Sequence, residues 1–181
     1  MDAPQLSDPP LALAPFRVEH VGARYLGWLA DEEVMRFTEA RFARVGQGEG
    51  EAYVAAAIAA PNAILWRIVV DEDEHIGNLR LSWVPAHRRG TIALIIGEKT
   101  QWGRGHARRC VALAAEFALG RLGLRKLTAG AYANNRASVR CFEAAGFVQE
   151  ARLKDHFTLA DGTACDGVLL ARFAASVARS Q

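Results

Sequence analysis

The chain has 181 residues, of which 51% are hydrophobic, and its formal net charge at pH 7 is +2. This length predicts a single domain, and no apolar run is long enough to cross a membrane. The small net charge argues against a nucleic-acid-binding protein, because such proteins concentrate positive charge on one face. We therefore expect neither nucleic acid nor a membrane as a partner.

The cysteines and the N-terminal segment indicate a reducing compartment. Cys110, Cys141 and Cys165 are odd in number and contain no Cys-x-x-Cys pair, which argues against a disulfide framework or a structural zinc site. The first residues, MDAPQLSDPP, lack the basic start and the apolar run of a signal peptide. These features predict a cytoplasmic protein.

The first third of the chain predicts one strand and three helices. Residues 1–10 are expected to form a disordered or extended tail before a single domain at 11–175. Residues 11–18 alternate as in a strand, and residues 19–37 carry apolar side chains at the spacing of two short helices. The alanine-rich residues 51–60 predict a third helix, which ends before a proline.

The remaining two thirds alternate between strands and helices. Three β-rich runs predict an antiparallel meander, at 64–71, 75–84 and 91–98. Residues 105–120 have apolar positions at intervals of three and four and form the strongest predicted helix. The last elements are a strand at 126–132, a short helix at 135–147, and two strands on either side of a turn at 161–162. Residues 176–181 form a C-terminal tail.

The entrance to the strongest helix, GEKTQWGRGHARRC, has the composition of an anion-binding loop. The first N–H groups of a helix lack partners within the helix and lie at the positive end of its dipole. Gly103 and Gly105 allow an anion to approach them, and three arginines attract it: Arg104, Arg108 and Arg109. The pattern is neither a P-loop nor a dinucleotide fingerprint. The alternative is a glycine turn before a surface helix with solvated arginines.

Three motifs around this loop carry a resemblance to a known family. WGRGHA is similar to the [QR]xxGx[GA] pyrophosphate loop, and Asn135 with Ser138 forms an Asn-x-x-Ser motif before FEAAGF. The chain thus resembles the GNAT superfamily of acyl-CoA-dependent N-acetyltransferases over residues 11–173, and more closely its RimJ/RimL-like branch. Trp102 occupies the leading Gln/Arg position, as it does in that branch. The resemblance implies an α+β fold with six to seven mostly antiparallel strands, splayed at the centre, and helices on both faces.

The resemblance also implies acetyl-CoA as co-substrate, bound in the splayed centre without a metal. The pyrophosphate would lie on the N–H groups of the loop: Gly103, Arg104, Gly105, His106, Ala107 and Arg108. The pantetheine arm would pair with the backbone of Ile95, Ile96 and Gly97, where an N–H could also stabilise the oxyanion. Asn135 either bonds to this arm or serves only as a helix cap.

Two proton transfers are needed, because an amine must lose a proton and the departing thiolate must gain one. Many family members use a tyrosine as the acid where this chain has Phe142, so the resemblance suggests Ser138 instead. The glutamate expected as the base is replaced by Phe157. Glu39 and His156 are our preferred bases, and two other candidates remain open: Tyr132 and Asp155. We expect Asp166 to support a turn or a strand end.

The predicted function is transfer of an acetyl group to a primary amine, either on a small molecule such as an amino sugar or at a protein N-terminus. Acidic side chains in residues 28–42 predict an acceptor-binding end that attracts an ammonium group: Asp31, Glu32, Glu33 and Glu39. A homodimer is compatible with this reading. The alternatives are a non-catalytic acyl-CoA binding or sensing domain and a plain α+β interaction domain.

Overall fold

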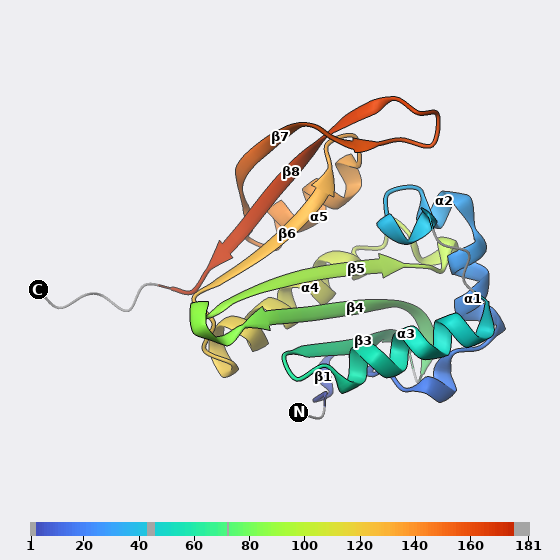
Figure 1. Cartoon of the computed structure of the whole chain (residues 1–181). Helices are drawn as coiled ribbons and strands as arrows, with labels where there is room; N and C mark the ends of the chain where they lie inside the picture. The colour runs from blue at the N-terminus through green and yellow to red at the C-terminus, as the bar shows by residue number, and fades with distance from the viewer. Residues whose placement is uncertain (1–2, 43–45, 72, 176–181) are drawn as a thin grey trace, which may run out of the picture.

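The computed structural model describes residues 3–42, 46–71 and 73–175. In these residues, eight strands form one sheet in the order β1-β2-β3-β4-β5-β6-β8-β7 (Figure 1). The strands are β1 (Leu6–Asp8), β2 (Leu11–Pro15), β3 (Ala63–Val70), β4 (Glu74–Val84), β5 (Arg89–Ile96), β6 (Lys126–Tyr132), β7 (Val148–Thr158) and β8 (Ala164–Phe173). All neighbouring pairs are antiparallel except β5 and β6, which are parallel.

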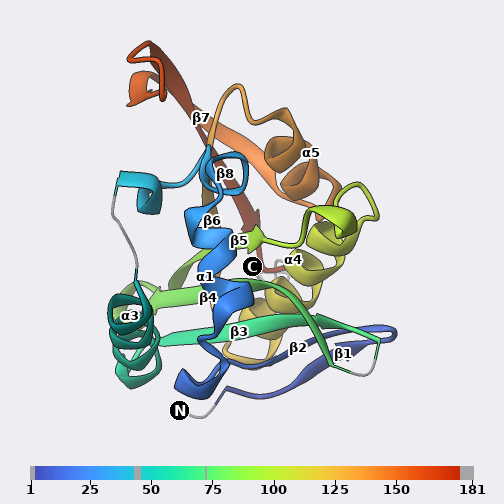
Figure 2. The ribbon, with the colours of Figure 1, turned by 90° about the vertical axis from the view of Figure 1, so that its right-hand side faces the viewer.

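Helices connect the strands on both faces of the sheet. The α-helices are α1 (Ala23–Ala30), α2 (Glu32–Met35), α3 (Gln47–Ala59), α4 (His106–Glu116) and α5 (Arg136–Ala144). Short helical turns are η1 (Val18–His20), η2 (Glu39–Phe42), η3 (Pro85–His87), η4 (Lys99–Gln101) and the π-turn η5 (Phe117–Arg121), which continues α4. Figure 2 shows α1 and α3 on one face, and α4 and α5 on the other. None of the helices in the described ranges combines the length and apolarity needed to span a membrane.

Two apolar clusters hold these layers together. The larger one lies between the sheet and the face of α4 that carries Cys110, Val111 and Ala114, all fully buried. The smaller one packs α1 and α3 against the opposite face, around Trp28 and Leu65. Because α4 is fixed along one side, its first turn has a defined position beside the end of β5.

The sheet splits between β5 and β6. The two strands pair only at their beginnings, where residues 89–91 lie beside residues 126–128. Both strands then continue for several residues without pairing to each other, β5 to Ile96 and β6 to Tyr132. Figure 1 shows the two parts of the sheet joined near the C-terminal end and diverging toward α2. Within the described residues, this geometry leaves one side of the second half of β5 without a neighbouring strand.

The expected fold class is confirmed, with one correction to the strand count. The sheet has eight strands rather than six to seven because Leu6–Asp8, inside the expected N-terminal tail, pairs with β2. A three-residue strand is too short to give an alternating pattern. Asp8 also accepts a hydrogen bond at 2.6 Å from Nε of Arg109, which fixes this edge strand to α4. The expected tail at 176–181 lies outside the described residues.

Candidate active site

The loop between β5 and α4 turns through two glycines in the left-handed region. Gly103 has φ +74° and Gly105 has φ +80°, values that side-chain-bearing residues rarely adopt. A Cβ added at either position would meet no heavy atom within 4 Å beyond those of the adjacent residues. The glycines are therefore needed for the backbone turn, and the space beside them is open.

The first turn of α4 presents free N–H groups to this open space. Gly105 is the N-cap and cannot supply a capping side chain, and its carbonyl accepts from the N–H of Arg109. The amides before Arg109 therefore have no acceptor within the helix. No acidic residue lies in this turn. The helix start thus has the properties of an anion site.

The side chains around this turn divide into two groups. Arg104 and Arg108 are exposed and free to face an anion, whereas Arg109 is held by Asp8 through a 2.6 Å ion pair. His106 lies 3.2 Å, through Nε2, from Oε1 of Gln101. Burial, followed by the charges of Arg109 and Arg104, lowers the pKa of His106 and so disfavours its charged form. The positive charge at the site therefore comes from two arginines and the helix.

The backbone of β5 has only alternate groups free on its open side. The N–H of Gly97 donates to the carbonyl of Ile76, at 2.9 Å, and Ile95 lies opposite Asn78 of β4. In an antiparallel ladder, successive residues direct their N–H and C=O groups to opposite sides. Ile96 therefore faces the split, and its carbonyl accepts from Nε1 of Trp102 at 2.8 Å. Of the three residues expected to bind pantetheine, only Ile96 has its backbone on the open side.

Tyr132 and Glu39 meet on the other arm of the split. Their hydroxyl and carboxylate are 2.7 Å apart, although the residues are 93 positions apart in the chain. Thr91 is paired with Thr128, so four residues further on, Tyr132 is at the level of Ile95 across the split. Tyr132 is buried, and burial followed by the hydrogen bond to Glu39 raises its pKa to about 12. The phenol is therefore a hydrogen-bond donor at neutral pH.

His156 and Phe157 lie next to Tyr132 on the same face. The ring of Phe157 stacks on that of Tyr132 with centroids 3.9 Å apart, and His156 contacts the edge of Phe157 at 4.6 Å. Both side chains fill the space above Gly167, which is paired with Tyr132 and has no side chain. His156 is exposed. It borders the site, whereas Glu39 makes the direct contact with Tyr132.

Asp166 supports the irregular segment that places these two rings. The strand β7 bulges between Leu153 and Phe157, where three of its residues lie opposite a single residue of β8, Asp166. The Asp166 carboxylate accepts from Nε of Arg152 at 2.6 Å and from the N–H of Asp155 at 3.0 Å. These hydrogen bonds lower the pKa of Asp166. The expectation of a structural role for Asp166 is confirmed.

The Asn-x-x-Ser motif begins α5, on the face of the sheet that also carries α4. Oδ1 of Asn135 accepts from the N–H of Ser138 at 3.1 Å, which makes Asn135 the N-cap. The Ser138 side chain is half-buried. Phe142 is buried in the core against Phe147, at 5.2 Å between ring centroids. Ser138 thus lies in the first turn of α5, on the face of the sheet that carries α4, whereas Glu39 contacts Tyr132 at the end of β6.

The acidic segment is partly neutralised. Nζ of Lys99 lies 2.7 Å from Asp31 and 3.1 Å from Glu33. The hydrogen bond to Lys99 lowers the pKa of Asp31, which also caps α2. Glu32 is exposed on the same short helix. Among these four acidic residues, Glu39 is the one bound to a side chain of the split.

Comparison with known proteins identifies this arrangement. The family model described as "Acetyltransferase (GNAT) domain" matches residues 11–148, which include the split, the glycine loop, α4 and α5. The chain belongs to the GNAT acetyltransferase family. Membership of this family supports the expectation that the protein is an acetyl-CoA-dependent acetyltransferase. None of the curated protein sequences compared with the chain is significantly similar to it.

Solved GNAT structures share the fold at low sequence identity. RimL, the ribosomal L7/L12 α-N-protein acetyltransferase in complex with coenzyme A, is 17% identical with a TM-score of 0.83, over 94% of this chain and 98% of its own. Spermidine N-acetyltransferase from Vibrio cholerae, with CoA and spermine, is 19% identical with a TM-score of 0.81, over 92% and 97%. A GNAT acetyltransferase from Bacillus anthracis is 13% identical with a TM-score of 0.81, over 94% and 99%. These similarities show that the chain shares the fold of these acetyltransferases.

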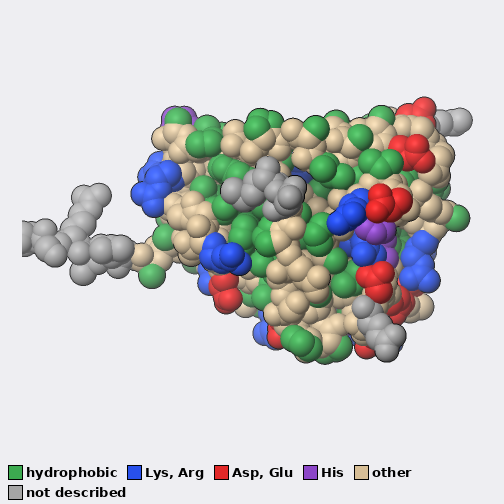
Figure 3. All heavy atoms as spheres, turned by 90° about the horizontal axis from the view of Figure 1, so that it is seen from below, with side chains coloured by type: hydrophobic (Ala, Val, Ile, Leu, Met, Phe, Trp, Pro, Cys, Tyr) green, Lys and Arg blue, Asp and Glu red, His purple; other side chains and the backbone are tan. Residues whose placement is uncertain are grey.

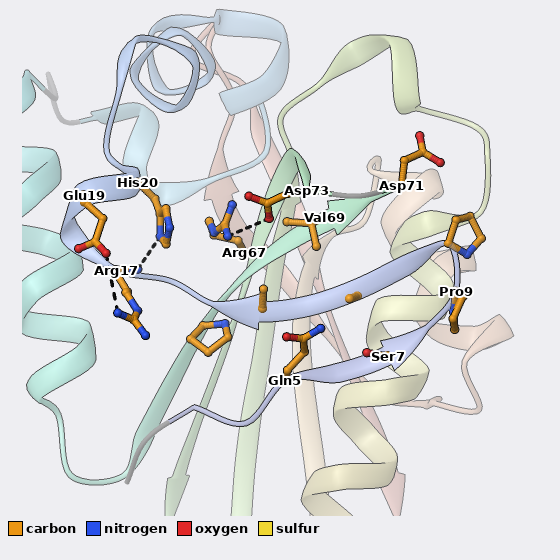
Figure 4. Close-up of a pocket in the computed structure, with 14 residues that line it drawn as sticks. Gln5, Ser7, Pro9, Arg17, Glu19, His20, Arg67, Val69, Asp71 and Asp73 are labelled. Atoms are coloured by element: carbon orange, nitrogen blue, oxygen red, sulfur yellow. Dashed lines mark hydrogen bonds and ion pairs between the residues drawn. The ribbon is translucent and has the colours of Figure 1, made fainter.

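Two of the cavities that the described residues form lie outside the split. One, of about 480 Å³, lies over β1, β2 and the end of β3 (Figure 4). Its arginines are already paired, Arg17 with Glu19 at 3.9 Å and Arg67 with Asp73 at 3.0 Å. Figure 3 shows charged side chains of both signs gathered at this end of the molecule. A second hollow, of about 470 Å³, lies between β1 and α4 and is bordered by Arg108. In the described ranges, no group of three or more His, Cys, Asp or Glu side chains is placed to hold a metal ion.

The end of β5 depends on a close contact between Gly97 and Trp28. A Cβ at Gly97 would overlap the indole ring, which is itself buried against His75 at 4.9 Å between centroids. We expect Gly97→Ala to lower the free energy of unfolding by roughly 1–3 kcal/mol, as overpacking does. Urea unfolding would measure this loss. Gly130→Ala, in β6 with open space around it, is the matched control; equal stability of the two variants would contradict the close contact.

Proposed function

We propose that this protein transfers an acetyl group from acetyl-CoA to a primary amine by direct attack of the amine on the thioester. The observation that carries the proposal is the split itself. Its one side offers the unpaired backbone of β5 leading to the free amides of α4, and its other side, at the level of Ile95, offers the Glu39 carboxylate bound to Tyr132. Donor and acceptor can therefore meet between the two strands.

The proposed donor site uses backbone groups. The pyrophosphate lies on the amides of residues 103–108, with Arg104 and Arg108 adding positive charge. The pantetheine arm pairs with the open side of β5 at Ile96, in the manner of an added strand. An N–H on this strand stabilises the tetrahedral oxyanion, a contribution of about 3 kcal/mol for one such donor in other acyl transfers.

The proposed chemistry separates the two proton transfers. The Glu39 carboxylate accepts the proton that the attacking amine loses, and His156 is the second candidate for that role. Ser138, from the α5 side, donates a hydrogen bond to the departing sulfur. A thiolate with a pKa of about 8.5 is a tolerable leaving group, so a weak hydroxyl donor suffices.

The acceptor is proposed to be a small-molecule amine, such as an amino sugar or a polyamine, or a protein N-terminus. Structural neighbours named for spermidine and for a ribosomal protein N-terminus support both classes. The motifs WGRGHA and Asn-x-x-Ser support assignment to the RimJ/RimL-like branch. We further propose a cytoplasmic location, a homodimer and no binding of nucleic acid.

Incubation with acetyl-CoA and a panel of amines, read as free thiol, tests the proposal. We expect turnover with at least one amine, and mass spectrometry of a cell extract treated with the protein would then identify the acetylated class. Acetyl-CoA binding measured by calorimetry is the parallel arm. Binding without turnover across polyamines, amino sugars and peptides would contradict the enzyme.

The second candidate function is a non-catalytic acyl-CoA binding or sensing domain. Two replacements favour it. Phe142 stands where many family members have the tyrosine that acts as general acid, and Phe157 stands where the resemblance predicts a glutamate. Neither phenylalanine can transfer a proton. The Glu39 pair with Tyr132 favours the enzyme, because it supplies an acid–base group from elsewhere in the chain.

Ser138→Ala tests the proposed donor to the sulfur. We expect kcat to fall by roughly tenfold to a hundredfold, with acetyl-CoA affinity unchanged, as for a modest acid–base contribution. The helix cap should survive, because Asn135 accepts from the backbone N–H of residue 138. Steady-state kinetics and thermal unfolding measure the two effects. An unchanged kcat would leave Ser138 with a role in the helix start alone.

A further inference from the structure

We infer that Tyr132 is a positioning residue, which holds the Glu39 carboxylate at the open end of the split; this inference rests on the proposed function. The hydroxyl of Tyr132 donates to Oε1 of Glu39 at 2.7 Å. The second carboxylate oxygen is then left to receive the amine proton. Glu39 lies in the short turn η2, which by itself gives little control over the direction of a side chain.

The Tyr132 ring is held by contacts with two other aromatic rings. Phe157 stacks on it with an angle of 12° between the ring planes, and Phe37 lies at 5.6 Å between centroids and 51°. Only 3% of Tyr132 is exposed. Since the ring cannot turn freely, its hydroxyl has a defined position. Tyr132 thus supplies a rigid anchor on β6 for a carboxylate that belongs to a turn.

A second contact holds the same turn to the same arm of the sheet. The guanidinium of Arg41 in η2 donates to the carbonyl of Thr158, the last residue of β7, and lies 5.7 Å from the centre of the Tyr132 ring. Arg41 also donates to the carbonyl of Arg36 at 3.2 Å. These bonds keep η2 near β7, while the bond from Tyr132 sets the direction of Glu39.

The position of Tyr132 is suited to this role. It is the last residue of β6 and, counted four residues on from the pair of Thr91 and Thr128, corresponds to Ile95 on the opposite arm of the split. The Thr91 and Thr128 hydroxyls are 3.1 Å apart, so the side chains of this register lie on one face of the sheet. A carboxylate anchored here faces the arm of the split on which the proposed donor site holds the thioester.

The first test needs no enzyme activity. The chain has three tyrosines, so protein labelled with 3-fluorotyrosine should give three ¹⁹F signals. Tyr132→Phe identifies the signal of residue 132. We expect Glu39→Gln to move this signal and leave the other two in place, because the charge that accepts the phenol proton is removed. An unmoved signal would refute the pairing and the inference with it.

The second test is kinetic. We expect Tyr132→Phe, which retains the ring stack, to lower kcat roughly tenfold with unchanged acetyl-CoA affinity and unchanged thermal stability. In the Glu39→Gln background the same change should have almost no further effect, because the hydroxyl acts through the carboxylate. Tyr25→Phe, which removes a buried hydroxyl from the smaller core cluster, is the control and should keep the wild-type rate.

The outcomes separate the inference from the proposed function. One contrary result is that Tyr132→Phe lowers kcat tenfold in the Glu39→Gln background as well, and another is that it leaves the wild-type kcat unchanged. Either result would overturn the positioning role of Tyr132 and leave the proposed acetyltransferase activity intact. Absence of turnover by the wild type with every amine would overturn the proposed function and the kinetic role together. The ¹⁹F result would then still show whether the hydroxyl and the carboxylate are paired.

Discussion

Gly105→Glu is expected to raise the dissociation constant for acetyl-CoA by roughly a hundredfold or more, with the fold retained. The new carboxylate would lie at the start of α4, where it would occupy the free amides and repel the pyrophosphate. Loss of charge-assisted hydrogen bonds worth about 1.5–3 kcal/mol accounts for an effect of this size. Isothermal titration calorimetry measures the binding.

The control for this variant must reproduce its backbone strain. Gly105 has φ +80°, so any side chain at this position costs about 1–2 kcal/mol in addition to its effect on the ligand. Gly162, in the turn between β7 and β8, has φ +82° and equally open surroundings. Gly162→Glu should therefore lose similar stability and keep its acetyl-CoA affinity. An acetyl-CoA dissociation constant of Gly105→Glu close to that of the wild type would refute the pyrophosphate site.

Glu39→Gln is expected to lower kcat at neutral pH by roughly a hundredfold and to raise the KM for the acceptor. The amide is similar in size and can still accept from Tyr132, but it cannot take a proton, and general bases contribute about 10²–10⁴ to rates. Acetyl-CoA affinity should not change, because Glu39 contacts Tyr132 of β6, on the opposite arm of the split from the proposed donor site. Kinetics with varied acceptor at several pH values would measure both parameters.

Glu32→Gln is the matched control for the Glu39 variant. Glu32 is exposed on α2, a few residues away, and its replacement makes the same change in net charge. We expect nearly wild-type kinetics. If Glu39→Gln also kept wild-type kinetics at every pH, the assignment of the base to Glu39 would be wrong, and His156→Ala would be the next variant to measure.

Most of the fold could be predicted because its patterns are local. The spacing of apolar residues in α4 and the alternation in β3, β4 and β5 each depend on a few neighbouring residues, and all of these elements are present. The glycine turn before α4 could also be predicted, since it depends on Gly103 and Gly105 within one short segment. The β1 strand was missed because three residues carry too little pattern, and its bond to Arg109 joins residues 101 positions apart.

The acceptor side of the site could be predicted only in part for the same reason. Sequence reasoning named Glu39 and Tyr132 separately, but nothing in the sequence pairs two residues 93 positions apart. The pairing arises where η2 meets the end of β6. Likewise, Lys99 was not expected to neutralise Asp31 and Glu33, because the contact joins α2 to the turn after β5. Ile95, Ile96 and Gly97 were predicted together to bind the pantetheine arm. Alternation along the strand turns only the backbone of Ile96 toward the split and that of the other two toward β4.

The split has a consequence for how the protein avoids association with other chains. Residues 92–96 of β5 form a strand edge in the middle of a sheet, and within the described ranges no strand pairs with their open side. Exposed edges are templates for aggregation. Here β6 begins as a direct neighbour and diverges, so the edge lies inside a wedge that narrows to ordinary strand spacing. A broad foreign sheet cannot enter such a wedge, whereas a single slender chain can. The unpaired edge of β5 is therefore accessible to one narrow ligand and shielded from the strands of other proteins.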